Sequence, residues 1–354
     1  MNGINLTSRI DLNAIQLRER ISTLGEQLST GRKGQSYAAI ATDAPKAIDL
    51  RSEIGRRETY QTTIDQTLSK TQVMQNVLDR LGAIAEKFTA ATAKLLGAGK
   101  PEEIQIQAAQ AEAAMVEVAT LLNEQLNNEY IFGGTDSRNP PIPDPGKIAT
   151  TGMGLAIRNA VASLNGANVA TVLSTTKSLA QSDVSGTTPF SAFLSDPAAG
   201  LNEPRRNVLG NDDDRISFGI KANSNGAVKS DGETTGSWAR DLLRGLASIA
   251  GLTKEKGQLG SDYTTFVTTV RAGLQSAVDA LAQERGALGV TENRLESVAE
   301  LHVSVTTSLT LQLSNLEEVD MAKTISVFQA TQTQLEASYR AMTIAQQLSL
   351  TRFL

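Results

Sequence analysis

The longest regular pattern of apolar positions occupies the C-terminal part of the chain. From residue 267 to residue 316, positions seven apart are almost all apolar, and most are followed three residues later by a second apolar or small residue. Alternating spacings of three and four put such residues on one face of a helix, and about seven heptads of them are typical of coiled-coil packing. We call its predicted core positions the rod seam: Leu274, Leu281, Leu288, Leu295, His302 and Leu309.

The two ends of the chain carry shorter stripes of the same kind. The first stripe ends at Gly31 and Gly34, which are natural helix stops, and the last one follows a break in register at residues 317–320. An isolated apolar stripe is exposed, so we expect the two to pair with each other and then with further copies, as in a self-assembling tube or fibre. This predicted assembly seam comprises Ile10, Leu17, Ile21, Leu24, Leu28, Ile325, Phe328, Leu335, Tyr339 and Met342.

Between these ends lie two more predicted helices and a region of different character. The segments 45–96 and 104–122 keep the heptad spacing, whereas seven of the nine prolines lie from Pro140 to Pro204. Turn-forming pairs such as Asn225-Gly226, and short runs such as 215–220, favour strands and turns there. The predicted fold is therefore mainly α, with a long coiled-coil helical rod formed by N- and C-terminal segments and an inserted β-rich or mixed domain in the middle. Ser237 is the expected N-cap of the helix that follows the insert.

Composition narrows the possible chemistry. Net charge is −5 and no basic stripe is present, which argues against a nucleic-acid partner. Without cysteine there is no thiol catalysis, and His302, the one histidine, lies in a heptad seam without ligand-spaced neighbours. The run Asn211–Asp214 lacks the spaced oxygens of a calcium loop and is better interpreted as a solvated turn. We therefore expect no enzyme activity, no catalytic or metal residues and no cofactor.

The N-terminal residues lack a basic segment followed by an apolar run, and no apolar stretch is long enough to span a bilayer. We accordingly expect no membrane partner, and any export would proceed without a cleaved signal peptide.

Several motifs resemble the bacterial flagellin family. Leu28–Lys33 (LSTGRK) resembles the end of that family's first helix, and Tyr37–Leu50 (YAAIATDAPKAIDL) resembles the start of its next one, although an alanine separates Asp43 from Pro45. The segments NEYIFGGT, from Asn128, and QLEASY, from Gln334, with the ending LSLTRFL, are similar to the hook–filament junction branch of the family. The resemblance covers roughly residues 1–137 and 237–354.

The resemblance implies an architecture and a set of partners. Residues 1–43 and 317–354 would form the two halves of an inner-tube coiled-coil domain, 44–137 and 237–316 the halves of a helical rod, and 138–236 an inserted variable domain. Family members are exported unfolded through the flagellar type III apparatus, usually with a chaperone, to an extracellular position in the flagellum. A junction member would form a ring of copies between a hook-side junction protein and flagellin.

Three alternatives stay open. The first is flagellin itself, the filament subunit. The second is a cytoplasmic coiled-coil tether, and the third is an enzyme hosted in the insert.

Overall fold

A computed structural model of the chain describes residues 3–98 and 101–350, without the side chains of 3–8, 10, 98 and 345–350. The chain divides into two compact units. Unit 1 comprises the residues up to 59 together with those from 301 on, and unit 2 comprises residues 60–300.

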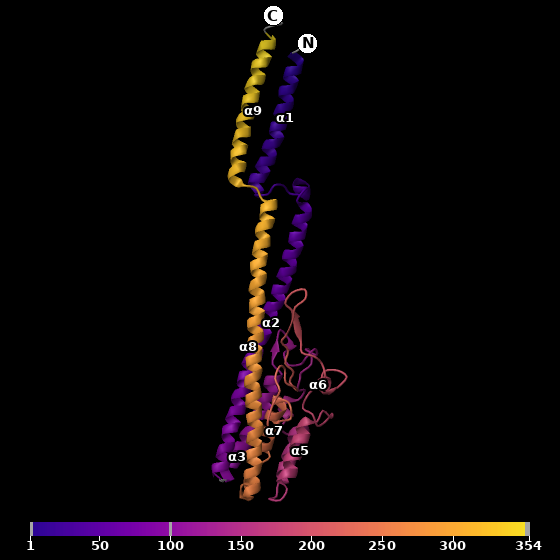
Figure 1. Ribbon diagram of the computed structural model, residues 1–354, viewed down its shortest axis with the longest axis vertical. Coiled ribbons are helices and arrows are strands. Elements are labelled where there is room, and N and C mark those ends of the chain that lie inside the picture. The colour runs from indigo at the N-terminus through magenta and orange to yellow at the C-terminus, as the bar shows by residue number, and fades with distance from the viewer. Residues whose placement is uncertain (1–2, 99–100, 351–354) are drawn as a thin grey trace. The chain divides into compact units, whose positions relative to one another are not determined.

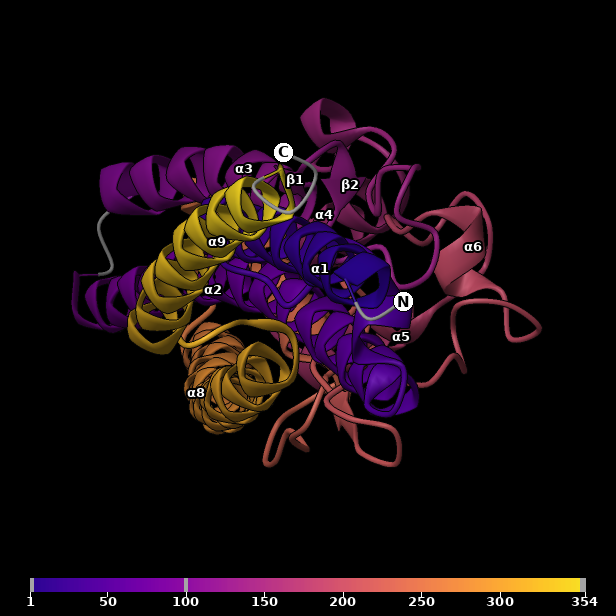
Figure 2. The ribbon, with the colours of Figure 1, turned by 90° about the horizontal axis from the view of Figure 1, so that it is seen from above.

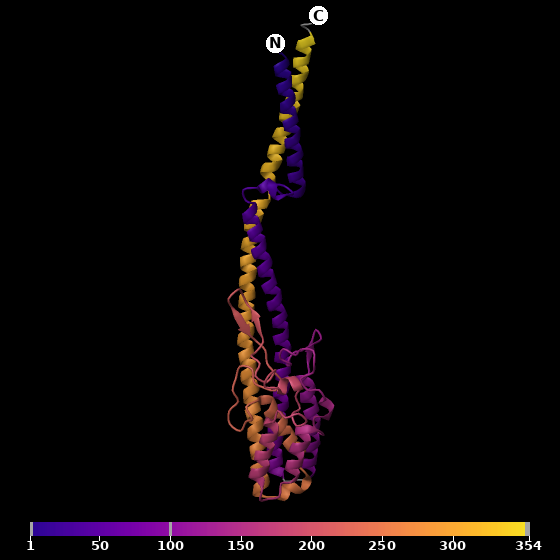
Figure 3. The same ribbon diagram turned by 90° about the vertical axis from the view of Figure 1, so that its right-hand side faces the viewer.

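Unit 1 is built from helices. It contains α1 (Gly3–Thr30), the 3-10 turn η1 (Tyr37–Ile40), the first part of α2 (Ala44–Ala98), the last part of α8 (Ser261–Glu317) and α9 (Met321–Leu350). Helices α1 and α9 lie side by side and run in opposite directions (Figures 1 and 3). Gly31 follows α1 with a φ of 72°, a left-handed conformation that glycine adopts without strain. Asp320 precedes α9, and its Oδ1 accepts the Lys323 N–H at 3.0 Å as a helix cap.

Unit 2 holds the remaining parts of α2 and α8 and all of the shorter elements. Its other longer helices are α3 (Pro101–Leu122), α4 (Gly152–Ala162), α5 (Val169–Gln181) and α7 (Trp238–Ala250). The turns η2 (Pro145–Lys147) and η3 (Lys254–Gln258) and the short α6 (Ala192–Ser195) complete its helical content. Within the unit, α6 and its neighbouring loops lie on the opposite side from α3 (Figure 2).

The strands of unit 2 form two small antiparallel hairpins. One pairs β1 (Gln125–Leu126) with β2 (Glu129–Tyr130) through a turn in which Asn127 and Asn128 both have positive φ. Asparagine tolerates that conformation better than most residues, as a tight hairpin turn requires. The other pairs β3 (Asn207–Leu209) with β4 (Arg215–Ser217), so that Val208 faces Ile216.

One continuous apolar core fills most of unit 2. All residues of α7 are buried, and the core extends from them to residues of α2, α3, α4, α5 and α8. Trp238, Phe88, Phe132 and Phe266 are among its fully buried side chains. A smaller separate cluster joins the β3–β4 hairpin to the long helices through Ile64, Val208, Ile216, Phe218 and Leu295.

The mainly α fold is confirmed, and each long helix predicted from the heptads is present. The segment 138–236 is mixed rather than β-rich, because among its described residues the strands have three residues each whereas α4 and α5 have 11 and 13. Met153, Ile157 and Val161 recur every fourth residue and are buried, a helical spacing that the prolines and Asn-Gly pairs obscured. The five-part domain division stays a prediction, and the unit 2 core continues into the insert.

Candidate assembly surface

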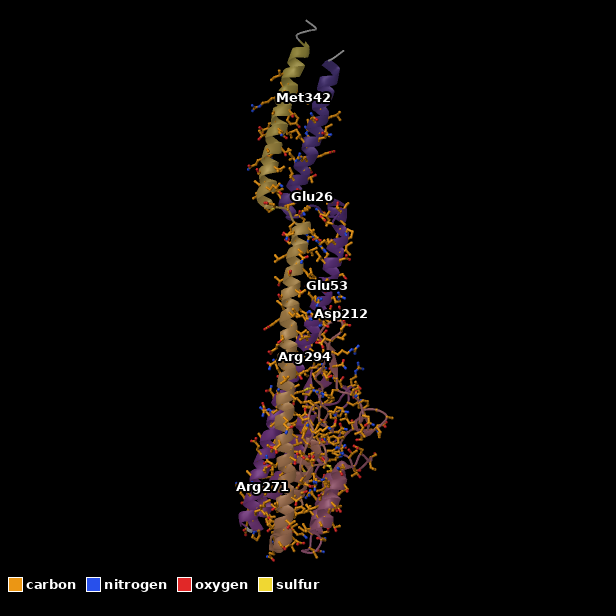
Figure 4. All side chains as sticks on the ribbon, viewed as in Figure 1. Glu26, Glu53, Asp212, Arg271, Arg294 and Met342 are labelled. Atoms are coloured by element: carbon orange, nitrogen blue, oxygen red, sulfur yellow. The ribbon has the colours of Figure 1, made fainter. Side chains whose placement is uncertain are left out.

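The assembly seam lies along the α1–α9 pair and is only partly covered. Ile325 is 44% exposed, and the side chain of Ile10 lies outside the described residues. Met342, labelled on α9 in Figure 4, is half-buried. The other predicted seam residues are also half-buried: Leu17, Ile21, Leu24, Leu28, Phe328, Leu335 and Tyr339. Most of the predicted seam residues are therefore partly covered in the single chain and still accessible to solvent.

Two contacts fix how α1 and α9 meet. Phe328 packs over Gly25, where a Cβ would stand 3.9 Å from its Cε2. Arg18 donates from Nε to the hydroxyl of Tyr339 at 2.5 Å, and its Cζ lies 5.4 Å from the centroid of that ring. A guanidinium over an aromatic face gains roughly 0.5–1 kcal/mol at an exposed site. The sequence interpretation missed Arg18; its position directly after the seam residue Leu17, on the flank where arginine stems commonly pack, is the signal that could have found it.

Both helices also present large apolar side chains outside the seam. Leu12 and Ile15 on α1 are 60% and 52% exposed, and Ile344 on α9 is 57% exposed. Single exposed apolar residues are ordinary, but several of them on one helix pair with a half-covered seam identify a surface that a further protein could cover.

Two chain segments meet at the end of α1 and the start of α9, within unit 1. We call this contact between residues 31–33 and 315–319 the joint. The Lys33 N–H donates to the Glu317 carbonyl at 2.8 Å, and the Val319 N–H donates to the Gly31 carbonyl at 2.9 Å. The Lys33 ammonium also donates to the carbonyls of Asn315 and Leu316, at 3.0 and 2.7 Å. These are among the last carbonyls of α8, which have no partner within the helix, and a cation there complements the helix dipole. The predicted register break is thus a hydrogen-bonded crossing of two chain segments.

An ion pair supports the joint from α2. Arg51 donates from Nε and Nη2 to the two carboxylate oxygens of Glu317, at 3.0 and 2.6 Å. The bidentate hydrogen bond from Arg51 is the main cause that lowers the pKa of Glu317, and it likewise raises the pKa of Arg51. The ion pair is therefore present at neutral pH and adds to the backbone hydrogen bonds of the joint.

The rod seam is buried more completely than the assembly seam. Leu274, Leu281 and Leu288 belong to the main core, and Leu295 belongs to the smaller cluster, all at most 1% exposed. In unit 1, His302 is 1% exposed and Leu309 is half-buried. Helix α7 approaches the seam closely at Gly245, where a Cβ would fall 2.4 Å from a methyl carbon of Leu274.

Two buried arginines on α7, which the sequence interpretation missed, hold α5. Arg240 donates to the Ala180 carbonyl at 2.9 Å and pairs with Asp183. Arg244 donates to the Leu173 carbonyl at 3.2 Å and pairs with Glu233 at 2.7 Å. Because the two arginines are four residues apart, their guanidiniums lie on the same face of α7. Charged side chains are rarely buried in this way, which is why the sequence pattern did not indicate them.

The polar turn at the tip of the β3–β4 hairpin is tied to the long helices. Tyr60 donates to Asp212 at 2.5 Å, and Arg294 donates to Asp214 at 2.6 Å. Among the residues that the structure describes, no group of three histidine, cysteine or acidic side chains is arranged to hold a metal. Within the same residues, no helix is both long and apolar enough to cross a membrane.

Comparison with known proteins gives a family match to the two C-terminal helices, α8 and α9. Residues 272–354 match the family described as "Bacterial flagellin C-terminal helical region", which spans most of α8 together with α9. The chain is flagellin-like. It is also 31% identical over 153 residues to "Flagellar hook-associated protein 3" of Escherichia coli (strain K12), an alignment that covers 42% of this chain and 47% of that relative. The chain thus matches about half the length of this curated relative.

Proposed function

We propose that this chain is a structural axial protein of the bacterial flagellum that joins a hook-side junction protein to the flagellin filament. It acts outside the cell as part of the flagellum, and an export chaperone assists its export. Its partners are copies of itself in a ring, the hook-side junction protein and flagellin. Its function is packing rather than catalysis.

The observation that carries the proposal is the incomplete burial of the α1–α9 pair. The two helices meet through apolar side chains, yet Ile325 remains 44% exposed and Leu12 remains 60% exposed in the single chain. Apolar surface gains about 25 cal/mol per Å² when it is removed from water, so copies that cover this pair would be stabilised by what one chain leaves exposed. Helix α9 also lies within the flagellin-type C-terminal match.

One alternative has specific support. The matched C-terminal region is described for flagellin, the filament subunit, so a filament-forming role remains the second candidate. The junction role is preferred because the curated relative is a hook-associated protein and because the NEYIFGGT and QLEASY motifs resemble that branch.

Seeded assembly distinguishes the two roles. The purified full chain is mixed with short flagellin filament fragments in one series and with purified hook-side junction protein in another, then examined by sedimentation and negative-stain microscopy. We expect saturable binding to the hook-side protein and to filament ends, with no long filaments. Long filaments that grow from the seeds would assign the chain as flagellin, and binding to neither partner would favour the tether.

Two variants show whether the seam carries the binding. Leu335→Ala removes a half-buried seam side chain of α9, and Gln334→Ala changes its exposed neighbour. The first is expected to abolish co-sedimentation and the second to leave it unchanged. Equal behaviour of the two variants would mean that binding uses another surface.

A further inference from the structure

A buried carboxylate of α8 holds the loop that leaves the insert. Glu284 is fully buried, and its Oε1 accepts the N–H of Gly226 at 2.6 Å and that of Val228 at 3.3 Å. The N–H of Ala227 lies 3.1 and 3.0 Å from Oε1 and Oε2. Successive backbone N–H groups that converge on one anion form a nest, and hydrogen bonds to an ionised acceptor are about twice as strong as neutral ones. We call this contact the Glu284 latch.

The residue before this nest is fixed through both polar atoms of its side chain. Asn225 donates from Nδ2 to the Ser230 hydroxyl at 2.9 Å, and its Oδ1 accepts the N–H of Trp238 at 2.9 Å. Trp238 is the first residue of the buried helix α7 and is itself fully buried. The amide of Asn225 is therefore held between a loop and the core of unit 2.

Asparagine followed by glycine is the pair most prone to spontaneous deamidation, because glycine has no side chain to hinder attack. The deprotonated backbone nitrogen of the glycine attacks Cγ of the asparagine, the Cγ–Nδ2 bond breaks and ammonia leaves. Water then opens the cyclic imide at either carbonyl, which gives aspartate or isoaspartate. The reaction needs no reagent other than water.

The Glu284 latch opposes each requirement of that reaction. The attacking nitrogen must lose its proton, yet the Gly226 N–H donates a hydrogen bond to Glu284 Oε1, which lies 2.6 Å from the nitrogen. A negative charge on the nitrogen would be repelled by the carboxylate, and at such short range in a buried site the repulsion is weakly screened. Rotation of Cγ toward the nitrogen would also break both hydrogen bonds of the Asn225 amide.

We propose that Asn225–Gly226 is a latent deamidation site that Glu284 keeps unreactive, and that opening of the latch converts Asn225 to aspartate or isoaspartate. Isoaspartate adds a methylene to the main chain and displaces the three N–H groups that meet Glu284. The latch then cannot re-form in its original geometry, so a chain modified at Asn225 keeps a permanent record that this loop had opened. This inference does not depend on the proposed function.

The sequence contains two further Asn-Gly pairs, of which Asn2 of the first lies outside the described residues and the second lies in a different environment from Asn225. Asn165–Gly166 lies in the exposed loop between α4 and α5, where Asn165 Oδ1 accepts the Ala167 N–H at 3.1 Å. Within the described part of the chain, no protein group accepts the Gly166 N–H. This site is a matched internal reference, since both asparagines share one chain, one buffer and one temperature.

The test follows both sites in the full-length protein. The chain is incubated in mildly alkaline buffer below its unfolding temperature, digested at intervals and mapped by mass spectrometry with isoaspartate detection. We expect Asn165 to react at least about tenfold faster than Asn225 in the folded chain, because reaction at Asn225 requires local opening. In denaturant the two rates are expected to become similar. Equal rates at the two sites in the folded chain would overturn the proposal.

A variant assigns the protection to the carboxylate. Glu284→Gln turns an amide NH2 toward the nest and is expected to raise the rate at Asn225 several-fold while the rate at Asn165 stays constant; Glu296→Gln, at an exposed position of α8, is the control. An unchanged rate at Asn225 in folded Glu284→Gln would overturn the role of the carboxylate. If that variant does not fold, the comparison of folded and denatured wild-type chain still decides whether the site is protected.

Discussion

Helices α7 and α9 show two ways of using an apolar face. Every residue of α7 is buried, including Arg240, Asp241 and Arg244. Along the described side chains of α9 the only buried ones are Thr324 and Thr331, whereas its large apolar residues are half-buried or exposed. The chain itself covers the whole of α7, whereas it leaves large apolar side chains of α9 in contact with solvent.

This difference indicates which of the two helices is stabilised by contacts within one chain. Hydrogen bonds within the chain offset the free-energy cost of burying the polar groups of α7. Asp241, for example, accepts the Thr235 N–H at 2.6 Å, while burial raises the pKa of its carboxyl group. For the α1–α9 pair, we propose that contacts between chains cover the apolar side chains that one chain leaves exposed. Four substitutions test this comparison.

The largest expected effect is at the rod seam. Leu281→Ala removes a side chain that is 1% exposed in the main core and is expected to lower the free energy of unfolding by about 2–5 kcal/mol. Chemical denaturation monitored by circular dichroism measures the change. A loss as small as that caused by an exposed substitution would show that the rod seam is not part of the cooperative core.

Adding a side-chain carbon to the tightly packed α7 should lower the free energy of unfolding somewhat less than Leu281→Ala does. Gly245→Ala places a Cβ 2.4 Å from Leu274, which the buried neighbours can relieve only by moving, and about 1–3 kcal/mol of destabilisation is expected. Alanine is the better helix former, by roughly 1 kcal/mol, and partly offsets this strain. Gly82→Ala, in α2 with no atom within 4 Å of the added carbon, is the matched control and should stabilise the chain. A stabilised Gly245→Ala would mean that the α7–α8 approach is looser than the structure shows.

In the free chain, Leu335→Ala should have a smaller effect than Leu281→Ala. Leu335 is half-buried, so less apolar area returns to water, and the expected loss is about 1 kcal/mol or less. Its effect on binding to hook-side junction protein should be far greater than on unfolding. Thermal unfolding and co-sedimentation of the same variant are compared, and equal effects on both would contradict the separation of stability from association.

The smallest effect concerns the joint. Glu317→Gln removes an ion pair whose Arg51 side chain is 45% exposed, so about 0.5–1 kcal/mol or less is expected. The pKa of Glu317 is lower in the folded chain than in the unfolded one, so its stabilisation is present at neutral pH and is lost as pH falls through the folded-state pKa. The difference between variant and wild type should therefore vanish in acid. A difference that persists there would mean that the substitution acts through packing instead.

The sequence predicted the long helices well because each carries its own periodic signal. Leu274, Leu281, Leu288 and Leu295 are buried as their spacing indicates, and Gly31 and residues 317–320 interrupt the helices where predicted. The insert was harder, since Met153, Ile157 and Val161 form too short a pattern to outweigh the surrounding prolines and turn pairs. The assembly role of the terminal seam stays a prediction.

Which segments are helical and which of their faces are apolar could be predicted from the amino-acid sequence, because both depend on residues close together in the chain. Which polar groups meet across long separations, such as Glu284 with the nest at Gly226 and Arg18 with Tyr339, follows only from the folded molecule. Those contacts depend on how packed elements converge in space. The spacing of residues along the chain does not predict such contacts. The Glu284 latch and the contact between Arg18 and Tyr339 could therefore be found only in the folded molecule.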